Sequence, residues 1–209
     1  YFVRHGESTG NAGDFRQGPD TPLSPLGESQ ARFVAERFRT IPVERVLVST
    51  YKRAMQTAGF INEITKKELE YTDLLVERIK PTSVVGLLKD DPEAIRIDQL
   101  TIQNFHNPGF KFEDGETFTE MKKRALDLLG LVDSFPEERI LLVTHGLFLR
   151  MILACVIMGG ELTSHEYWKF YQYLEMGNTS ITVIVKEANW KLLSWGDIAH
   201  LGDVSVTTG

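Results

Sequence analysis

Two segments of the chain place a histidine after a mostly apolar run and before a glycine. Arg4-His5-Gly6 follows Phe2 and Val3, and His145-Gly146 follows the run 139–144. A neutral imidazole is a competent nucleophile and can carry a covalent intermediate. The glycine lets backbone N–H groups approach an anion closely. Either segment alone is a weak signal, because a strand can also end in an exposed arginine and a hydrogen-bonded histidine.

Arg53 is a third candidate for this chemistry. It falls in the first turn of a helix expected to follow the strand 45–49. A cation there opposes the helix dipole by ~0.3–1 kcal/mol, which indicates that it is needed to meet an anion. An arginine fork binds phosphate through two bonds, which lysine cannot copy. If the strands are neighbours, Arg4, His5, Arg53 and His145 converge on one phosphoryl group.

This set of residues needs no metal ion for phosphoryl chemistry. Arg4, Arg53 and a protonated His145 would each hold one equatorial oxygen, and losing one such donor typically costs ~3–4 kcal/mol. A magnesium site would require a carboxylate cluster at the same edge, and the sequence offers none. Two arginines beside a His5–His145 pair would also repel a cation. We therefore expect neither a metal nor a cofactor.

The elements that must position these residues alternate between strands and helices. Strands are expected before Arg4 and at 45–49, 70–75, 139–144, 179–186 and 190–195, and helices at 25–40, 50–58, 117–135, 147–156 and 164–174. Such alternation predicts an α/β fold in three layers, with a mostly parallel central sheet and helices on both faces. The turn at Asn189-Trp190 predicts that the last two strands form an antiparallel hairpin.

A single domain over residues 1–209 is expected, with an insertion around 80–115 that packs over the sheet edge as a lid. Helical patches are predicted in it at 84–88 and 92–100. Three phenylalanines and three lysines of the insertion indicate a substrate with some apolar surface: Phe105, Phe110, Phe112, Lys80, Lys89 and Lys111. The alternative is that these aromatic residues form a small core of the insertion itself.

Composition limits the remaining classes of protein. With 42% hydrophobic and 25% charged residues, the chain is typical of a soluble globular protein. Its net charge of −6 argues against nucleic acid as a partner. The longest apolar run, 147–158, is too short to span a membrane and contains Arg150. The single Cys155 is expected in the core, which suits a cytoplasmic protein.

Three further features follow from the sequence. The chain begins at Tyr1, already in a strand, so we expect residues to precede it. The polar tail from Asp203 is expected to be loosely held. The oligomeric state stays open, with a homodimer among the options.

The motifs taken together resemble those of the histidine phosphatase superfamily, which includes the cofactor-dependent phosphoglycerate mutases. They are Arg4-His5-Gly6-Glu7, Asn11, Gln17-Gly18, Leu23-Ser24-x-x-Gly27, Ser49-Thr50-x-x-Arg53-Ala54-x-x-Thr57-Ala58, Glu77, Gly115-Glu116, Val143-Thr144-His145-Gly146, Asn178-Thr179-Ser180 and His200-Leu201. The match runs over nearly the whole chain. It implies a phosphoglycerate mutase-like fold for the three layers predicted above.

The resemblance also implies roles for individual residues. His5 would be the phosphorylated nucleophile. The residues that would cradle the phosphoryl group are Arg4, Asn11, Arg53, His145 and Gly146, while Gln17 and Gly18 would line the substrate side. Glu77 would protonate the leaving oxygen and then deprotonate the attacking water, for which a dry site is needed. Glu116 is the alternative proton donor, and Glu77 could instead be an exposed residue at a helix start, paired with Arg78.

We expect a histidine-type acid or broad phosphatase, a metal-independent phosphomonoester hydrolase acting on a small-molecule phosphoester. Mutases of the family carry a longer insertion with a Tyr-Gly element after the general acid, whereas residues 77–83 here lack it. Two alternatives stay open: a cofactor-dependent phosphoglycerate-type phosphomutase, and a catalytically weak protein that only binds a phosphate ligand. The sequence leaves the phosphoester itself open.

Overall fold

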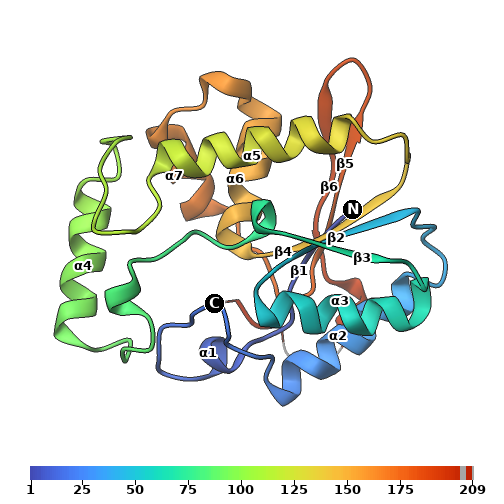
Figure 1. Cartoon of the computed structure of the whole chain (residues 1–209), viewed down its shortest axis with the longest axis horizontal. Helices are drawn as coiled ribbons and strands as arrows, with labels where there is room; N and C mark the ends of the chain where they lie inside the picture. The colour runs from blue at the N-terminus through green and yellow to red at the C-terminus, as the bar shows by residue number, and fades with distance from the viewer. Residues whose placement is uncertain (203–205, 209) are drawn as a thin grey trace.

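Six strands form one sheet in the computed structural model, in the order β3-β2-β4-β1-β5-β6 (Figure 1). The strands are β1 Phe2–Arg4, β2 Arg45–Ser49, β3 Leu69–Thr72, β4 Ile140–Thr144, β5 Ile181–Lys186 and β6 Trp190–Asp197. β3, β2, β4 and β1 are parallel, whereas β5 is antiparallel to β1 and β6 to β5. The expected three-layer α/β fold with a mostly parallel sheet is confirmed, and so is the hairpin at its end.

The structure describes residues 1–202 and 206–208. The first residues of the polar tail, 203–205, lie outside this range, as does Gly209. The α-helices are α1 Thr9–Ala12, α2 Pro25–Arg37, α3 Lys52–Thr65, α4 Pro92–Gln103, α5 Phe118–Asp133, α6 Gly146–Met158 and α7 Ser164–Tyr173. Short 3-10 turns are Asp73–Leu75, Thr82–Val84, Gly159–Glu161 and Ala199–Leu201. Over the described ranges, no helix is both long enough and apolar enough to cross a membrane.

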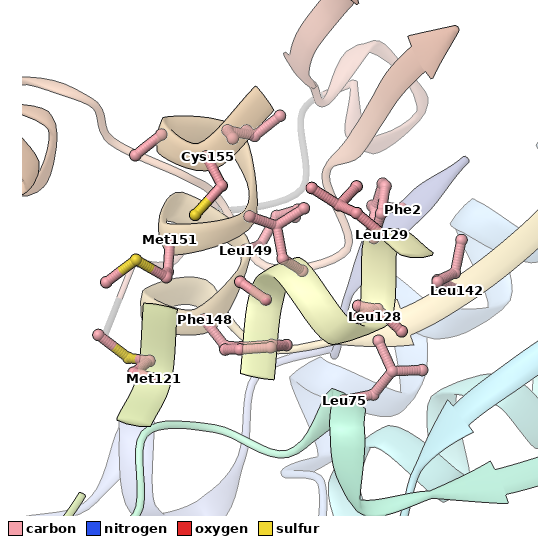
Figure 2. Close-up of a cluster of buried hydrophobic side chains, with 14 of the residues drawn as sticks. Phe2, Leu75, Met121, Leu128, Leu129, Leu142, Phe148, Leu149, Met151 and Cys155 are labelled. Carbon is pink, nitrogen blue, oxygen red and sulfur yellow. The ribbon is translucent and has the colours of Figure 1, made fainter. Parts of the chain in front are cut away.

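Two hydrophobic cores hold the helices against the two faces of the sheet. Val46 and Val48 of β2 face the core that includes α2 and α3, whereas Leu47 faces the core that includes α5 and α6. Successive side chains of a strand point to opposite faces, so one buried strand serves both layers. Figure 2 shows the second core, in which Leu128 of α5 lies between Phe148 of α6 and Leu142 of β4. Cys155 is buried there, as expected.

Capping residues fix where several helices begin. Ser24 accepts a hydrogen bond from the backbone N–H of Gly27 at 3.0 Å, and Pro25 takes the first position of α2. Thr117 caps α5 in a reciprocal pair with Glu120. Both arrangements satisfy backbone N–H groups that a helix start leaves without partners. α5 ends at Asp133, two residues before the end predicted for the helix 117–135.

The insertion differs from its prediction in one part. Residues 84–88 are not helical: a 3-10 turn at Thr82–Val84 leads into extended chain in which Leu88 pairs with Phe15. The prediction was wrong because Gly86 has a φ of +84° and its N–H bonds to the carbonyl of Arg16, so tertiary pairing overrides local helix preference. The second patch is helical, as α4.

Candidate active site

The carboxyl ends of three neighbouring strands build the site. β4 lies between β1 and β2, with Arg4 opposite Thr144 and Val48 opposite Val143 in the two registers. The loops after these strands therefore meet at one edge. The ring centres of His5 and His145 lie 4.9 Å apart, and Nε of Arg53 is 3.2 Å from Nε2 of His5. The structure thus brings the predicted residues together.

The hydrogen bonds of His5 define its tautomer. Its Nδ1 lies 2.6 Å from the carbonyl oxygen of Gly6, which can only accept, so Nδ1 carries the hydrogen. Nε2 then keeps a lone pair and accepts from Arg53. Burial, followed by Arg53 and Arg4, holds the pKa of His5 well below its ordinary value. The imidazole is neutral at pH 7, with its free nitrogen directed at the guanidinium.

Two buried guanidiniums flank this imidazole. Arg4 donates from Nη1 to the carbonyl of Met176, and Arg53 donates from Nη1 to the carbonyl of Gly18 at 2.9 Å. Burial lowers the pKa of each to about 10, so both stay charged near neutral pH. A Cβ on Gly146 would lie 3.2 Å from Nε of Arg4, tighter than most such contacts. Glycine at this position therefore lets α6 begin against Arg4.

His145 is buried beside the two arginines, and its surroundings favour the neutral form. Its Nε2 lies 2.8 Å from Oγ of Ser49, and its Nδ1 is buried without a hydrogen-bond partner among the described residues. Burial, then Arg53 and His5, hold its pKa well below the ordinary value. A protonated His145 that holds a phosphoryl oxygen stays a prediction for the complex with a dianion; beside the two arginines alone, a third positive charge in a dry pocket is costly.

Glu77 lies at the start of α6 rather than at the start of a helix of its own. One carboxylate oxygen accepts from the backbone N–H groups of Phe148 and Arg78, both at 2.9 Å, and the other accepts from Leu147 at 3.2 Å. Its charge acts on Arg4 and Arg53. The alternative of an exposed residue paired with the Arg78 side chain does not describe it, since Glu77 is half-buried. Its capping of α6 was not predicted.

Glu116 has a different environment. Its carboxylate accepts from Nε and Nη2 of Arg124 at 2.8 and 2.7 Å, and from the N–H of Ile79 at 3.2 Å. Arg124 also donates to the carbonyl of Val76 at 2.7 Å and lies 3.7 Å over the ring of Phe148. This buried pair braces the loop that carries Glu77. Sequence reasoning did not identify Arg124, which has no motif of its own.

The predicted substrate-side residues occupy the loop after β1. The amide oxygen of Asn11 accepts from Ser8 N at 3.1 Å and so caps α1, while Ser8 Oγ donates to Gln17 Oε1 at 2.7 Å. A Cβ on Gly18 would lie 2.6 Å from Val85 of the insertion. Asn11 and Gln17 are thus fixed to Ser8, two residues beyond Gly6, and Gly18 is tied to Arg53 through its carbonyl.

The chain after α7 holds the backbone of His5 in place through hydrogen bonds. The side-chain amide of Asn178 donates to the carbonyl of His5 at 2.9 Å, and the N–H of Thr179 donates to it at 3.3 Å. Thr179 has a φ of +58°, a strained value for this residue, and its hydroxyl lies 3.2 Å from Nε2 of His200. His200 is therefore a hydrogen-bonding residue, as expected, and His106 and His165 are exposed.

Two features of the surroundings bear on ligands. Across the described residues, no three His, Cys, Asp or Glu side chains group so as to hold a metal ion. Phe105 stacks on Tyr167 with ring centres 5.8 Å apart and lies 5.0 Å from Trp168. Phe105 therefore packs on α7 and against the main core, so the alternative of a small core formed by the insertion itself does not describe it.

Comparison with known proteins identifies relatives over nearly the whole chain. A family model described as the histidine phosphatase superfamily (branch 1) matches residues 1–198. The probable phosphoglycerate mutase GpmB of Enterobacter sp. (strain 638) is 32% identical over 216 residues, covering 96% of this chain and 94% of that protein. The GpmB of Photorhabdus laumondii is 30% identical over 217 residues, with the same coverage.

Solved structures with the same fold include proteins with phosphatase names. Bacillus stearothermophilus YhfR superposes with a TM-score of 0.80 at 25% identity, covering 96% of this chain and 97% of that one. A phosphoserine phosphatase variant from Entamoeba histolytica, in complex with phosphoserine, gives 0.76 at 24% identity and the same coverage. The mycobacterial glucosyl-3-phosphoglycerate phosphatase with VO3 gives 0.75 at 24%, covering 93% and 96%.

Proposed function

Since the chain belongs to the histidine phosphatase superfamily (branch 1), we propose that it hydrolyses phosphomonoesters through a phosphohistidine formed on His5. One observation carries this proposal: Nδ1 of His5 is held by the Gly6 carbonyl, which leaves the lone pair of Nε2 beside the charged fork of Arg53. A fixed neutral nucleophile next to permanent cations suits attack on a dianionic phosphoryl group.

In the first half-reaction, Nε2 of His5 forms a bond to phosphorus as the ester P–O bond breaks. Arg4 and Arg53 hold the phosphoryl oxygens while charge moves onto the leaving oxygen. Glu77 delivers a proton to that oxygen, so an alcohol leaves. The position of Glu77 at the start of α6, with its charge acting on both arginines, supports this role.

In the second half-reaction, water attacks phosphorus and gives a proton to Glu77 as the P–N bond breaks. Inorganic phosphate leaves, and His5 recovers its free Nε2. The sum of both steps is one ester and one water converted to an alcohol and phosphate. A bound dianion also favours the charged form of a nearby imidazole, so His145 gains a proton and donates to the phosphoryl group once substrate is in place.

A second candidate is a phosphoglycerate-type mutase, which the names of the two relatives given above favour. In that case a phosphoryl group already on His5, supplied by a bisphosphate primer, is transferred to one hydroxyl of the acid, and the phosphoryl group on the other hydroxyl returns to His5. The residues after Glu77 argue against it, because they lack the Tyr-Gly element of mutases. A protein that binds phosphate without turnover is the third option, and the presence of both His5 and Glu77 argues against it.

The experiment is hydrolysis of p-nitrophenyl phosphate at mildly acidic and neutral pH, with a chelator and no added metal. We expect release of phosphate, an acid-labile phosphoprotein after quenching, and loss of both in His5→Ala. Labelling retained in His5→Ala would move the nucleophile elsewhere. No release from any ester would support the binding protein. Primer-dependent transfer between the hydroxyls of a phosphoglycerate, without net hydrolysis, would identify the mutase.

A further inference from the structure

The two peptide groups that flank Gly6 set the direction of the His5 imidazole. The carbonyl of Gly6 holds Nδ1 of His5 at 2.6 Å, and this carbonyl shares one planar peptide group with the N–H of Glu7. The preceding peptide group joins the carbonyl of His5 to the N–H of Gly6, which donates to the hydroxyl of Thr57 at 3.1 Å. Contacts that fix the planes of these two groups therefore also fix the imidazole.

Two buried side-chain amides hold these peptide groups. Gln30 of α2 accepts from the N–H of Glu7 through Oε1 at 2.8 Å, and Asn178, which precedes β5, donates from Nδ2 to the carbonyl of His5 at 2.9 Å. Both side chains are fully buried. A backbone N–H can only donate and a carbonyl can only accept, so these contacts define which end of each amide faces the peptide group.

The hydroxyl of Thr207 bonds to the other end of both amides. It donates to Oδ1 of Asn178 at 3.0 Å and accepts from Nε2 of Gln30 at 3.2 Å. A hydroxyl can donate and accept at the same time, whereas an ionised carboxylate only accepts and an ammonium only donates. Thr207 thus connects the two amides that hold the chain on both sides of Gly6.

The backbone around Thr207 is held in place as well. Its carbonyl accepts from the N–H of Asn178 at 2.9 Å. A Cβ on Gly177 would lie 3.0 Å from Cγ1 of Val206, so the chain here packs closely against the turn before β5. Thr207 is half-buried, whereas the neighbouring Thr208 is exposed. Two adjacent threonines therefore differ in their surroundings and can be compared directly.

Loss of the Thr207 hydroxyl would act on the nucleophile through Asn178. Its Oδ1 would lose this donor inside a buried site, and a buried acceptor without a partner is costly. An amide that turns to find another donor moves its Nδ2 away from the carbonyl of His5. The backbone of the nucleophile would then lose one of the contacts that fix it.

We propose that Thr207 is a positioning residue for the reaction, which sets the direction and the tautomer of the His5 imidazole through Gln30 and Asn178. It acts on how well Nε2 is aimed at phosphorus. Binding of phosphate should change little, because the two guanidiniums of the pocket keep their own contacts. The effect on the reaction rests on the proposed function, whereas the tautomer of His5 can be measured without any substrate.

The first experiment compares three variants of the full chain in hydrolysis of p-nitrophenyl phosphate. Thr207→Val removes the hydroxyl at nearly constant shape, Thr207→Ser keeps it, and Thr208→Val makes the same change at the exposed neighbour. We expect Thr207→Val to lower kcat by about 10-fold to 100-fold, because a small misplacement of a reacting group has an effect of this size. The inhibition constant of inorganic phosphate should stay within about threefold, and Thr207→Ser should retain most of kcat.

Two outcomes of this experiment would overturn the proposal. An equal loss of kcat in Thr208→Val would mean that the hydroxyl of Thr207 has no special part. A lower midpoint in urea for Thr207→Val, with kcat within about twofold of the original, would make Thr207 a residue that only stabilises the fold. Circular dichroism checks that each variant is folded. If valine is not tolerated, Thr207→Ala replaces it, and a fall in kcat of at least about fivefold is expected.

The second experiment measures the tautomer of His5 by nitrogen-15 NMR of histidine-labelled protein, with His5→Ala to identify its signals. We expect the Nδ1–H tautomer alone in the original protein and in Thr208→Val, and a mixture of both tautomers in Thr207→Val. The Nδ1–H tautomer alone in Thr207→Val would overturn the proposal, even if kcat falls. The expected mixture, together with no hydrolysis of any ester by the original protein, would instead overturn the proposed function and leave the positioning of His5 standing.

Discussion

Arg53 makes two contacts that a lysine could not make together. Its Nε donates to His5 and its Nη1 to the carbonyl of Gly18, while its guanidinium lies 5.1 Å from the ring centre of Tyr51. The planar fork fixes the directions of these donors, whereas an ammonium is a point charge on a flexible stem. Arg53 therefore contributes to the site through the fixed directions of its donors as well as through its charge.

We expect Arg53→Lys to lower kcat/KM by about 100-fold to 1000-fold, since it removes one oriented donor from the transition state. The measurement is steady-state hydrolysis of p-nitrophenyl phosphate. Arg39→Lys is the control, because Arg39 is exposed and pairs with Glu36 at the surface. An effect below about fivefold would reduce Arg53 to a residue that attracts anions from solution.

Glu77 and Glu116 form a natural pair for assigning the proton donor. Glu77→Gln keeps a carbonyl oxygen that can still accept from the start of α6, so the fold should hold. We expect kcat to fall by about 100-fold or more, as for loss of general acid–base catalysis. Vanadate affinity should stay within about threefold of the original, because the arginines are intact. Unchanged kinetics would remove Glu77 from the proton transfer.

Glu116→Gln should act on stability instead. It breaks the buried ion pair with Arg124, and loss of one partner of such a pair typically costs ~3–5 kcal/mol. We expect a lower midpoint in denaturant, with kcat of the folded fraction reduced much less than in Glu77→Gln. A large loss of kcat with no change in midpoint would make Glu116 the proton donor.

At the scale of elements, sequence patterns predicted individual strands and helix starts, but they missed contacts between residues that are far apart in the chain. The strand 45–49 and the capped start of α2 follow from apolar runs and from Ser24, so they were predicted closely. The capping of α6 by Glu77 could not be predicted in this way, because Glu77 is 70 residues before Leu147 in the chain. The low pKa of His145 could not be predicted for the same reason, since burial is set by the whole fold.

The contact between the first loop and α2 can be tested with glycine. A Cβ on Gly27 would lie 1.9 Å from the carbonyl oxygen of Glu7, which is backbone and cannot move aside alone. We expect Gly27→Ala to destabilise the protein by about 1–3 kcal/mol, as overpacking does. It should also lower kcat, because the loop that shifts carries His5. The readouts are the free energy of unfolding in denaturant and kcat.

Gly59→Ala is the matched control within α3. A Cβ there would meet nothing within 4 Å. Alanine in a helix interior is favoured over glycine by roughly 0.5–1 kcal/mol, so this variant should be more stable with kcat unchanged. If both variants lose stability equally, the contact with Glu7 is not the reason for glycine at position 27.

At the scale of the whole molecule, an acidic chain with a net charge of −6 encloses a pocket of buried cations. Alternating strands and helices predicted this pocket on the condition that the strands are neighbours, because parallel strands end at the same edge; the strand order β2-β4-β1 meets that condition. The insertion 80–115 was less predictable, since its extended part pairs with the loop after α1 rather than with itself. Phe105 of the insertion packs on Tyr167 of α7.

The buried histidines make stability depend on pH. Burial holds the pKa values of His5 and His145 well below the ordinary value and lowers that of His200 to about 4. In the unfolded chain a histidine titrates near ~6.5. Below that pH the unfolded chain binds more protons than the folded protein, so the free energy of unfolding falls as pH is lowered. Each histidine adds a slope of at most ~1.4 kcal/mol per pH unit.

We expect the free energy of unfolding, measured in urea, to be highest above about pH 7 and to fall between about pH 6.5 and 5. His145→Gln should flatten this fall, since it removes a group that must stay neutral when buried. His165→Gln is the control, because His165 is exposed. The same slope in both variants would mean that His145 is protonated in the folded protein, and the neutral pair of imidazoles that begins the proposed reaction would have to be abandoned.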